Sequence, residues 1–191
     1  MSIFTKKKVR SLTDEEIVEL IMSSGNSEFF EEIYDRYAKK IFSKCLSFSK
    51  NTPEAKDLAH DVLIKIYLNL SKYKEKAKFS TWIYAIAYNY CVDYQVKRKK
   101  QMTILEELKN DDPELLVQNH ADDELAEITT EILKQLLEKV SLAEKTILLM
   151  KYQDNFSIKE IAKTIGVGES AVKMKLMRSK AKLMKLYEEG R

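Results

Sequence analysis

Apolar residues recur along most of the chain at intervals of three and four positions, the spacing of one face of an α-helix. The clearest runs are Phe29, Phe30, Ile33, Tyr34, Tyr37, Ile41 and Phe42; Leu58, Val62, Ile66 and Leu70; and Ile83, Ile86, Ala87, Tyr90 and Tyr94. The predicted helices cover residues 13–23, 27–49, 53–71, 80–99, 125–139, 142–152, 158–165 and 169–187. The sequence therefore predicts an all-α fold.

Helix-start signals support these boundaries. In a capping box, a Ser or Thr side chain accepts from an early backbone N–H group, and a Glu three residues later reaches back to the cap. Three such boxes pair Thr13 with Glu16, Ser141 with Glu144, and Ser157 with Glu160. Two further N-caps are predicted, at Thr52 before Pro53 and at Ser80.

Residues 101–124 interrupt the helical pattern. They are acidic, contain Pro113 and lack sustained periodicity, apart from a helical turn expected near Ile104–Leu108. The chain is therefore expected to form two small helical domains, residues 1–100 and 125–191, joined by an acidic linker. Residues 1–10 are expected to be mobile.

Composition narrows the chemistry. The 191 residues include only four Gly and two Pro. Because only Gly takes positive φ at little cost, a Gly-rich phosphate-binding loop is excluded. Cys45 and Cys91 lie far apart, and neither His60 nor His120 belongs to a metal-ligand spacing, so we expect no metal or other cofactor. The chain has no apolar stretch of signal-peptide or membrane-spanning length, which favours a soluble cytoplasmic protein with reduced thiols.

The net charge of +3 conceals three blocks of opposite sign. Residues 1–100 carry 19 Lys and Arg against 13 Asp and Glu, a net of +6. Residues 101–140 carry 3 against 11, a net of −8, and residues 141–191 carry 11 against 6, a net of +5. Two basic blocks on either side of an acidic one favour binding to a polyanion, although surface charge also clusters by chance.

Residues 157–180 have the pattern of a helix-turn-helix, whose second helix enters the DNA major groove. A short capped helix is expected to end at Ile165, Gly166 suits a left-handed C-cap, and a second helix follows Gly168. A small core is expected from Ile161, Ile165, Val167, Val172 and Leu176. The residues predicted to contact duplex DNA are Ser170, Ala171, Lys173, Met174, Lys175, Met177 and Arg178.

Residues 72–100 combine bases with aromatic rings. A lysine-rich loop leads into a helix that holds one Trp and four Tyr and ends in a basic run. Such a mixture suits single-stranded nucleic acid, in which bases stack on rings and cations follow the backbone. Trp82, Ile83, Ile86 and Tyr90 are expected to lie in the core or to anchor the helix, whereas Tyr84, Tyr88 and Asn89 are predicted on an exposed face.

Asp57, Asp61 and Lys65 follow one another at intervals of four and therefore share a helix face. Neither a nucleophile nor a histidine partner accompanies the two carboxylates, which argues against acid–base catalysis. A docking face for a protein partner and an ordinary solvated face both remain open on these residues alone.

Three segments, taken in order, resemble the extracytoplasmic-function (ECF) group of bacterial RNA polymerase sigma factors, in the sigma-70 family. They read PEAKDLAHDVLIKIY from Pro53, KFSTWIYAIAYNYCVDYQVKRKK from Lys78, and SLAEKTILLMKYQDNFSIKEIAKTIGVGESAVKMKLMRSKAKL from Ser141. The first two resemble sigma region 2 and the third resembles sigma region 4. The sequence is thus identified as a member of a family that directs promoter-specific transcription initiation and is not itself enzymatic.

The resemblance implies a division of labour. Region 2 binds the β′ clamp helices of core RNA polymerase, here through Asp57, Asp61 and Lys65, and melts the minus-10 promoter element. The residues implied in minus-10 binding are Lys74, Lys78, Ser80, Thr81, Tyr84, Tyr88, Asn89, Lys97 and Arg98. Region 4 reads the minus-35 element as duplex and contacts the polymerase β flap, while the linker threads toward the RNA-exit path. An anti-sigma factor is a further implied partner, and no direct insertion into a membrane is expected.

Two other functions compete with this interpretation. A stand-alone helix-turn-helix regulator would use residues 1–100 for dimerisation or ligand binding, but such a domain does not need a surface for single strands. A helical enzyme acting on nucleic acid would need a catalytic constellation, which we do not find in the sequence.

Overall fold

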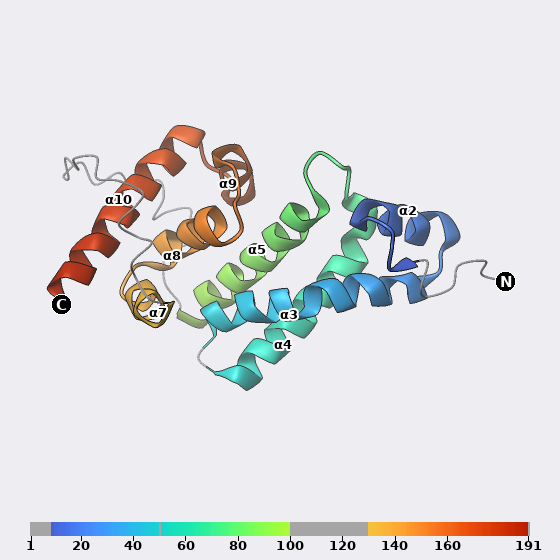
Figure 1. Cartoon of the computed structure of the whole chain (residues 1–191), viewed down its shortest axis with the longest axis horizontal. Helices are drawn as coiled ribbons and strands as arrows, with labels where there is room; N and C mark the ends of the chain where they lie inside the picture. The colour runs from blue at the N-terminus through green and yellow to red at the C-terminus, as the bar shows by residue number, and fades with distance from the viewer. Residues whose placement is uncertain (1–8, 50, 100–129, 191) are drawn as a thin grey trace. The chain divides into compact units, whose positions relative to one another are not determined.

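The computed structural model describes residues 9–49, 51–99 and 130–190, and these residues form helices joined by short connections (Figure 1). The all-α prediction is confirmed for this part of the chain. The chain divides into two compact units, residues 1–95 and 96–191. The predicted linker at residues 101–124, its turn near Ile104–Leu108 and the start of the predicted helix at residues 125–129 lie outside the described residues.

The described residues of the first unit form α-helices and single turns of 3₁₀-helix. Their order is α2 (Asp14–Ser24), η1 (Ser27–Phe29), α3 (Phe30–Phe48), α4 (Thr52–Asn69), η2 (Leu70–Lys72) and α5 (Phe79–Lys99). The predicted capping box at Thr13 is confirmed, since the Thr13 side chain accepts from the Glu16 N–H and the Glu16 side chain accepts from the Thr13 N–H. A left-handed Gly25 ends α2.

Contacts at both ends of α5 define its direction. Tyr37 of α3 packs against Phe79 at the start of α5, and the Phe48 carbonyl at the end of α3 accepts from Gln95. The two helices therefore run parallel. The Tyr90 hydroxyl of α5 donates to Asp61 of α4 at 2.8 Å, and the Tyr94 hydroxyl donates to Glu54 at 2.5 Å. Because the later residue of α5 contacts the earlier residue of α4, the two helices run antiparallel.

The core of this unit lies between α3, α4 and α5. Its fully buried side chains include Ile33, Ile41, Cys45, Val62, Ile66, Ile83 and Cys91. Burying one such aliphatic side chain contributes about 1.5–3 kcal/mol. The two thiols meet at 3.7 Å between their sulfur atoms, and this contact together with burial raises the pKa of Cys91.

The second unit contains α7 (Thr130–Glu138), α8 (Leu142–Leu148), a π-helical turn η4 (Leu149–Gln153), α9 (Ile158–Ile165) and α10 (Glu169–Glu189). Its core is formed by apolar side chains from every element, among them Leu136, Ile147, Met150, Phe156, Ile161, Val172 and Leu183. The capping boxes predicted at Ser141 and Ser157 are confirmed.

Four local predictions were wrong. Asn51, not Thr52, caps α4, because its side-chain oxygen accepts from the Glu54 N–H. Ser80 lies inside α5 rather than at its cap, because the helix begins at Phe79. The helix predicted over residues 142–152 changes to a π-helical turn after Leu148. Residues 9 and 10, expected to be mobile, are held in place: Val9 is 5% exposed, and the Arg10 carbonyl accepts from Arg36.

Candidate nucleic-acid interface

A closed loop, residues 73–78, connects η2 to α5. The Tyr73 hydroxyl donates to the Ala77 carbonyl at 2.9 Å and so joins the two ends of the loop. Glu75, between them, has a positive φ of 53°, a conformation uncommon for residues other than Gly. The loop therefore has a defined shape, and it presents the exposed side chains of Lys74, Lys76 and Lys78.

Three aromatic rings, one of them from Tyr73 of the loop itself, cluster where the loop meets α5. Tyr73 and Phe79 meet edge to face with centroids 5.1 Å apart, and Phe79 stacks on Trp82 at 5.6 Å. Tyr73 also contacts Trp82 at 5.5 Å. Phe79 is buried, whereas Tyr73 and Trp82 remain half-exposed. The combination of accessible rings and lysine side chains matches what single-stranded nucleic acid requires.

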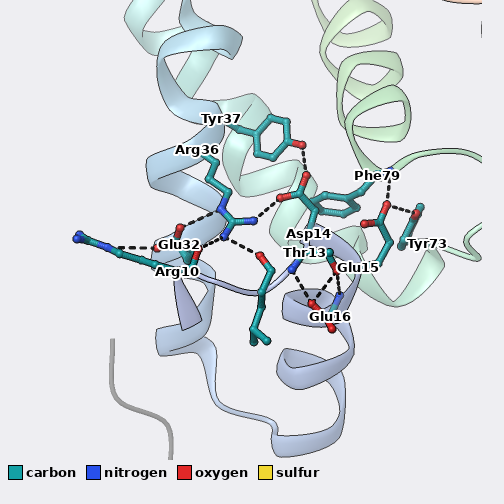
Figure 2. A network of polar contacts seen from close by, with 11 residues as sticks. Arg10, Thr13, Asp14, Glu15, Glu16, Glu32, Arg36, Tyr37, Tyr73 and Phe79 are labelled. Atoms are coloured by element: carbon teal, nitrogen blue, oxygen red, sulfur yellow. Dashed lines mark hydrogen bonds and ion pairs between the residues drawn. The ribbon is translucent and has the colours of Figure 1, made fainter. Parts of the chain in front are cut away.

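Carboxylates from the first turn of α2 reach this region and α3 (Figure 2). Asp14 accepts from Arg36 at 2.8 Å and from the Tyr37 hydroxyl. Glu15 instead accepts from the Phe79 backbone N–H at 3.1 Å and lies 3.4 Å from the Tyr73 hydroxyl. Partial burial and the Glu15 carboxylate raise the pKa of Tyr73 to about 12.

Arg36 joins the chain before α2 to α3. Its guanidinium donates to the Leu12 carbonyl at 2.9 Å and the Arg10 carbonyl at 3.1 Å, besides its ion pairs with Asp14 and Glu32 (Figure 2). Burial and the Asp14 carboxylate raise the pKa of Tyr37. Glu15, Arg36, Tyr37 and Tyr73 did not figure among the predicted site residues. For Tyr73, the sequence offered one indication, which is its position within the lysine-rich stretch KYKEKAK.

The residues predicted on α5 do not share one face. Ser80 and Thr81 are half-buried near its start, Asn89 is exposed in its middle, and near its end Lys97 is exposed and Arg98 half-buried. Asn89 follows Tyr84 by five residues, which is about 140° around the helix. The structure thus brings together the loop lysines and the first turn of α5, and it separates them from Asn89, Lys97 and Arg98.

Tyr88 contradicts its prediction. It is 1% exposed, and its ring packs edge to face against Phe48 of α3 with centroids 5.9 Å apart. Tyr84 is half-buried, with the Lys44 ammonium 4.0 Å from its ring centroid. Of the residues expected in the core or as anchors of the helix, Ile83 is buried, and Trp82, Ile86 and Tyr90 are half-buried.

In the second unit, α9 and α10 form the predicted helix-turn-helix. Gly166 has φ 72° and ends α9, and both its own N–H and that of Val167 donate to the Ala162 carbonyl. Gly168 then precedes the first residue of α10. Ile161, Ile165, Val172 and Leu176 are buried as predicted, and Val167 is half-buried.

The buried residues of α10 define its outward face. Val172, Leu176, Ser179 and Leu183 form the inner stripe. Ser170 and Met174 lie on the opposite side, are exposed, and have Met177 next to them on the following turn. Lys173 is also exposed, while Ala171, Lys175, Met177 and Arg178 are half-buried. The residues predicted to contact duplex DNA therefore lie along the accessible side and edges of α10.

The predicted charged surface on α4 is present, and it also contains exposed apolar side chains. Asp57, Asp61 and Lys65 are exposed. Between and beyond them lie two exposed apolar side chains, Ile64 at 45% and Leu68 at 69%. Neither Ile64 nor Leu68 was predicted. In the sequence, both could have been found as apolar residues that lie outside the buried stripe of Leu58, Val62 and Ile66. Ile64 and Leu68 are one helical turn apart and so adjoin on the surface of α4, and adjoining exposed apolar residues rimmed by charge are a feature of protein-docking surfaces.

Metal and membrane chemistry receive no support from the described ranges. Among residues 9–49, 51–99 and 130–190, no cluster of three or more His, Cys, Asp or Glu side chains could hold a metal ion. None of the helices in those ranges is both long and apolar enough to cross a membrane.

The two units together define a class of protein: a helical DNA-binding protein with one element suited to duplex DNA and another suited to single strands. The sigma-70 region 2 family model matches residues 33–101, and the sigma-70 region 4 model matches residues 130–183. The chain belongs to the sigma-70 family of RNA polymerase sigma factors, within its ECF group, and directs promoter-specific transcription.

Curated relatives agree over almost the whole length. The ECF RNA polymerase sigma factor SigW of Bacillus subtilis (strain 168) is 28% identical over 192 aligned residues, covering 97% of both chains. The ECF RNA polymerase sigma factor SigM of the same organism is 27% identical, covering 84% of this chain and 96% of its own. A stand-alone helix-turn-helix regulator is therefore not favoured.

Solved structures show the same fold. CnrH, solved in complex with the cytosolic domain of CnrY, superposes with a TM-score of 0.64 at 19% identity, covering 93% of this chain and 99% of its own. The sigma factor RpoE from Bartonella quintana, solved with the anti-sigma factor NepR, gives a TM-score of 0.60 at 19% identity, covering 85% and 98%.

Proposed function

We propose that the chain divides promoter recognition between its two ends. Residues 1–100 act as sigma region 2, which docks on core RNA polymerase and opens the minus-10 element. Residues 101–124 act as a linker, and residues 125–191 act as region 4, which reads the minus-35 element. The observation that carries this proposal is the presence in one chain of a helix-turn-helix and a closed, lysine-bearing loop over accessible aromatic rings.

Minus-10 binding is centred on the loop at residues 73–78 and the first turn of α5. Lys74 and Lys78 neutralise phosphates of the melted strand, and Ser80, Thr81 and Tyr84 border the place where an unstacked base is held. Asn89, Lys97 and Arg98 lie further along α5 and contact the adjoining DNA. Extruding a base costs a few kcal/mol, which these contacts must offset. Tyr88 is removed from the set, because its ring is buried.

Minus-35 binding is assigned to the start of α10. Ser170, Ala171, Lys173, Met174 and Met177 face the major groove, and Lys175 and Arg178 reach its edges or the phosphates. The methionines offer apolar contact rather than hydrogen bonds, so they suit the thymine methyl group. Loss of one base contact is expected to cost about 1–3 kcal/mol.

Docking on core polymerase is assigned to the exposed surface of α4. Asp57, Asp61 and Lys65 set the orientation against the β′ clamp helices, and Ile64 and Leu68 supply the apolar contact. Region 4 meets the β flap. Because CnrH and RpoE were solved with CnrY and NepR, we also assign this chain an anti-sigma partner. The chain acts in the cytoplasm, where its polymerase is, and performs no catalysis of its own.

The test is transcription in vitro with purified core polymerase. The reconstituted holoenzyme selects its promoter from a random DNA library, and initiation is then measured on the selected sequence. We expect initiation only when the chain and the core enzyme are both present. A chain that binds the selected DNA as a dimer and never binds core polymerase would instead be a stand-alone regulator, and sizing chromatography separates the two cases.

A further inference from the structure

Glu15 is unusual among the acidic residues in the first turn of α2, because its carboxylate reaches the first residue of α5. Its neighbour Glu16 accepts from Thr13 and completes the capping box of α2 itself. The other neighbour, Asp14, binds Arg36 and Tyr37 of α3. Glu15 alone of the three reaches Phe79, the first residue of α5, which lies 64 positions later in the chain (Figure 2).

This contact supplies the helix cap that the local sequence lacks. The first N–H groups of a helix have no intrahelical partner, and a carboxylate placed near them also interacts favourably with the helix dipole. Ser80 cannot cap α5, because it lies within the helix. The Glu15 carboxylate takes this role across the fold, with its Oε1 atom 3.1 Å from the Phe79 nitrogen.

The same oxygen also lies next to the residue that closes the loop. A phenol has one proton, and the Tyr73 hydroxyl gives it to the Ala77 carbonyl at the shorter distance of 2.9 Å. Glu15 is 3.4 Å from that hydroxyl, so its strongest bond is the one to Phe79. Glu15 thus contacts Tyr73, where the loop at residues 73–78 begins, and Phe79, the residue directly after it. The lysine side chains of the loop are exposed to solvent.

We propose that Glu15 is a positioning residue for the minus-10 loop. It holds residues 73–79 in their binding shape before DNA arrives, so α2 influences promoter opening without touching DNA. The inference rests on the proposed function of the loop. A preformed loop avoids the ordering cost that a flexible one would incur on binding.

Charge alone predicts the opposite effect. A carboxylate near a phosphate-binding loop repels DNA, so removing it should strengthen binding if Glu15 acted only through its charge. If Glu15 positions the loop, its removal weakens binding. The sign of the change therefore distinguishes the two roles.

The experiment measures how tightly reconstituted holoenzyme binds a single-stranded oligonucleotide that carries the minus-10 sequence of its selected promoter. We expect Glu15→Ala to weaken this binding about tenfold, the effect of losing one charge-assisted hydrogen bond. Glu15→Asp keeps the charge but is one methylene too short to reach Phe79, so it should weaken binding similarly. Glu15→Gln keeps an acceptor oxygen within reach of Phe79 but loses the charge, so it should weaken binding less than Glu15→Ala does.

Glu16→Ala is the matched control. It removes the same charge from the same helical turn and weakens the cap of α2, but it leaves the contact with Phe79 intact. Binding of the oligonucleotide should stay within about twofold, and all four variants should bind core polymerase like the unmodified chain.

Several results would overturn the inference. Unchanged or tighter oligonucleotide binding by Glu15→Ala and Glu15→Asp would exclude a positioning role. An equal loss in Glu16→Ala, or loss of core binding in the Glu15 variants, would assign the residue to folding alone. If the unmodified holoenzyme does not bind the oligonucleotide, or if Lys74→Ala with Lys78→Ala leaves binding unchanged, the proposed function of the loop itself fails.

Discussion

Gly166 occupies a backbone conformation that other residues adopt only at a cost. Its φ of 72° lies in the left-handed region, and this geometry lets two successive N–H groups reach the Ala162 carbonyl. Gly168, two residues later, has an ordinary φ of −73°, and a Cβ there would have no neighbour within 4 Å. The backbone conformation of the turn therefore favours Gly at position 166 but not at position 168.

Gly166→Ala is predicted to lower the free energy of unfolding by about 1–2 kcal/mol, the cost of placing a Cβ in the left-handed region. Gly168→Ala is the matched control and should change it by no more than about 0.5 kcal/mol, because its backbone conformation suits any residue. Urea denaturation followed by circular dichroism measures both. Equal effects at the two positions would contradict this account of the turn.

Side chains show where sequence reasoning at this scale succeeds and fails. Capping boxes at Thr13, Ser141 and Ser157 were predictable, because both partners lie within four residues of each other. The cap of α5 was not, because its acceptor comes from Glu15 in a distant helix. Tyr88 was assigned to the wrong face, because only the packing of Phe48 reveals which side of α5 is covered.

The positions of the helices were predictable from the periodicity of apolar residues. Which side of each helix is buried was less predictable. α9 and α10 each have one buried side, and their inner stripe follows directly from the spacing of the apolar residues. α5 packs against both α3 and α4, so its polar and aromatic residues contact protein on more than one side. The lysine loop was found from its composition, but its closed shape depends on Tyr73 and Ala77.

A contact between α8 and α10 predicts how the free energy of unfolding depends on pH. Glu144 completes the capping box of α8, in which Ser141 is the N-cap, and it also pairs with Lys182 of α10 at 3.0 Å. Burial acts to raise the pKa of Glu144, but the Ser141 N–H and the Lys182 ammonium outweigh it, so the pKa lies below its ordinary value of 4.5. The folded state therefore binds this proton less readily than the unfolded state does.

The stabilisation from ionised Glu144 should be fully present above about pH 4.5 and should be lost as pH falls through the lower pKa of the folded state. Glu144→Gln should lower the free energy of unfolding at pH 7 by about 1 kcal/mol. It should also make that free energy fall less steeply between pH 5 and pH 3, since Gln does not titrate. Urea denaturation at a series of pH values tests this, and an unchanged acid slope in the variant would contradict it.

At the scale of the whole molecule, the two basic blocks coincide with the two surfaces that we propose bind DNA. The basic N-terminal block contains the loop at residues 73–78, and the basic C-terminal block contains α10. Family membership and the helix-turn-helix were predictable because their motifs are local in sequence. The exposed Ile64 and Leu68, which we propose as docking residues, were not predictable, because exposure of an apolar residue depends on what packs against it.

The central claim is that the two ends of the chain perform separable steps, and initiation on two templates tests it most directly. One template is the duplex promoter, and the other is the same promoter with its minus-10 element already mismatched and open. The variants are Lys173→Ala in α10 and the pair Lys74→Ala with Lys78→Ala in the loop. Lys185→Ala, an exposed lysine near the far end of α10, is the control.

On the duplex, both test variants should initiate less, by a factor corresponding to about 1–3 kcal/mol per lost contact. On the open template the loop variant should recover most of its activity, because the strand no longer has to be held against re-annealing. Lys173→Ala should keep its full deficit, because the minus-35 duplex is unchanged. Equal recovery of both variants, or of neither, would contradict the assignment of opening and duplex reading to different ends of the chain.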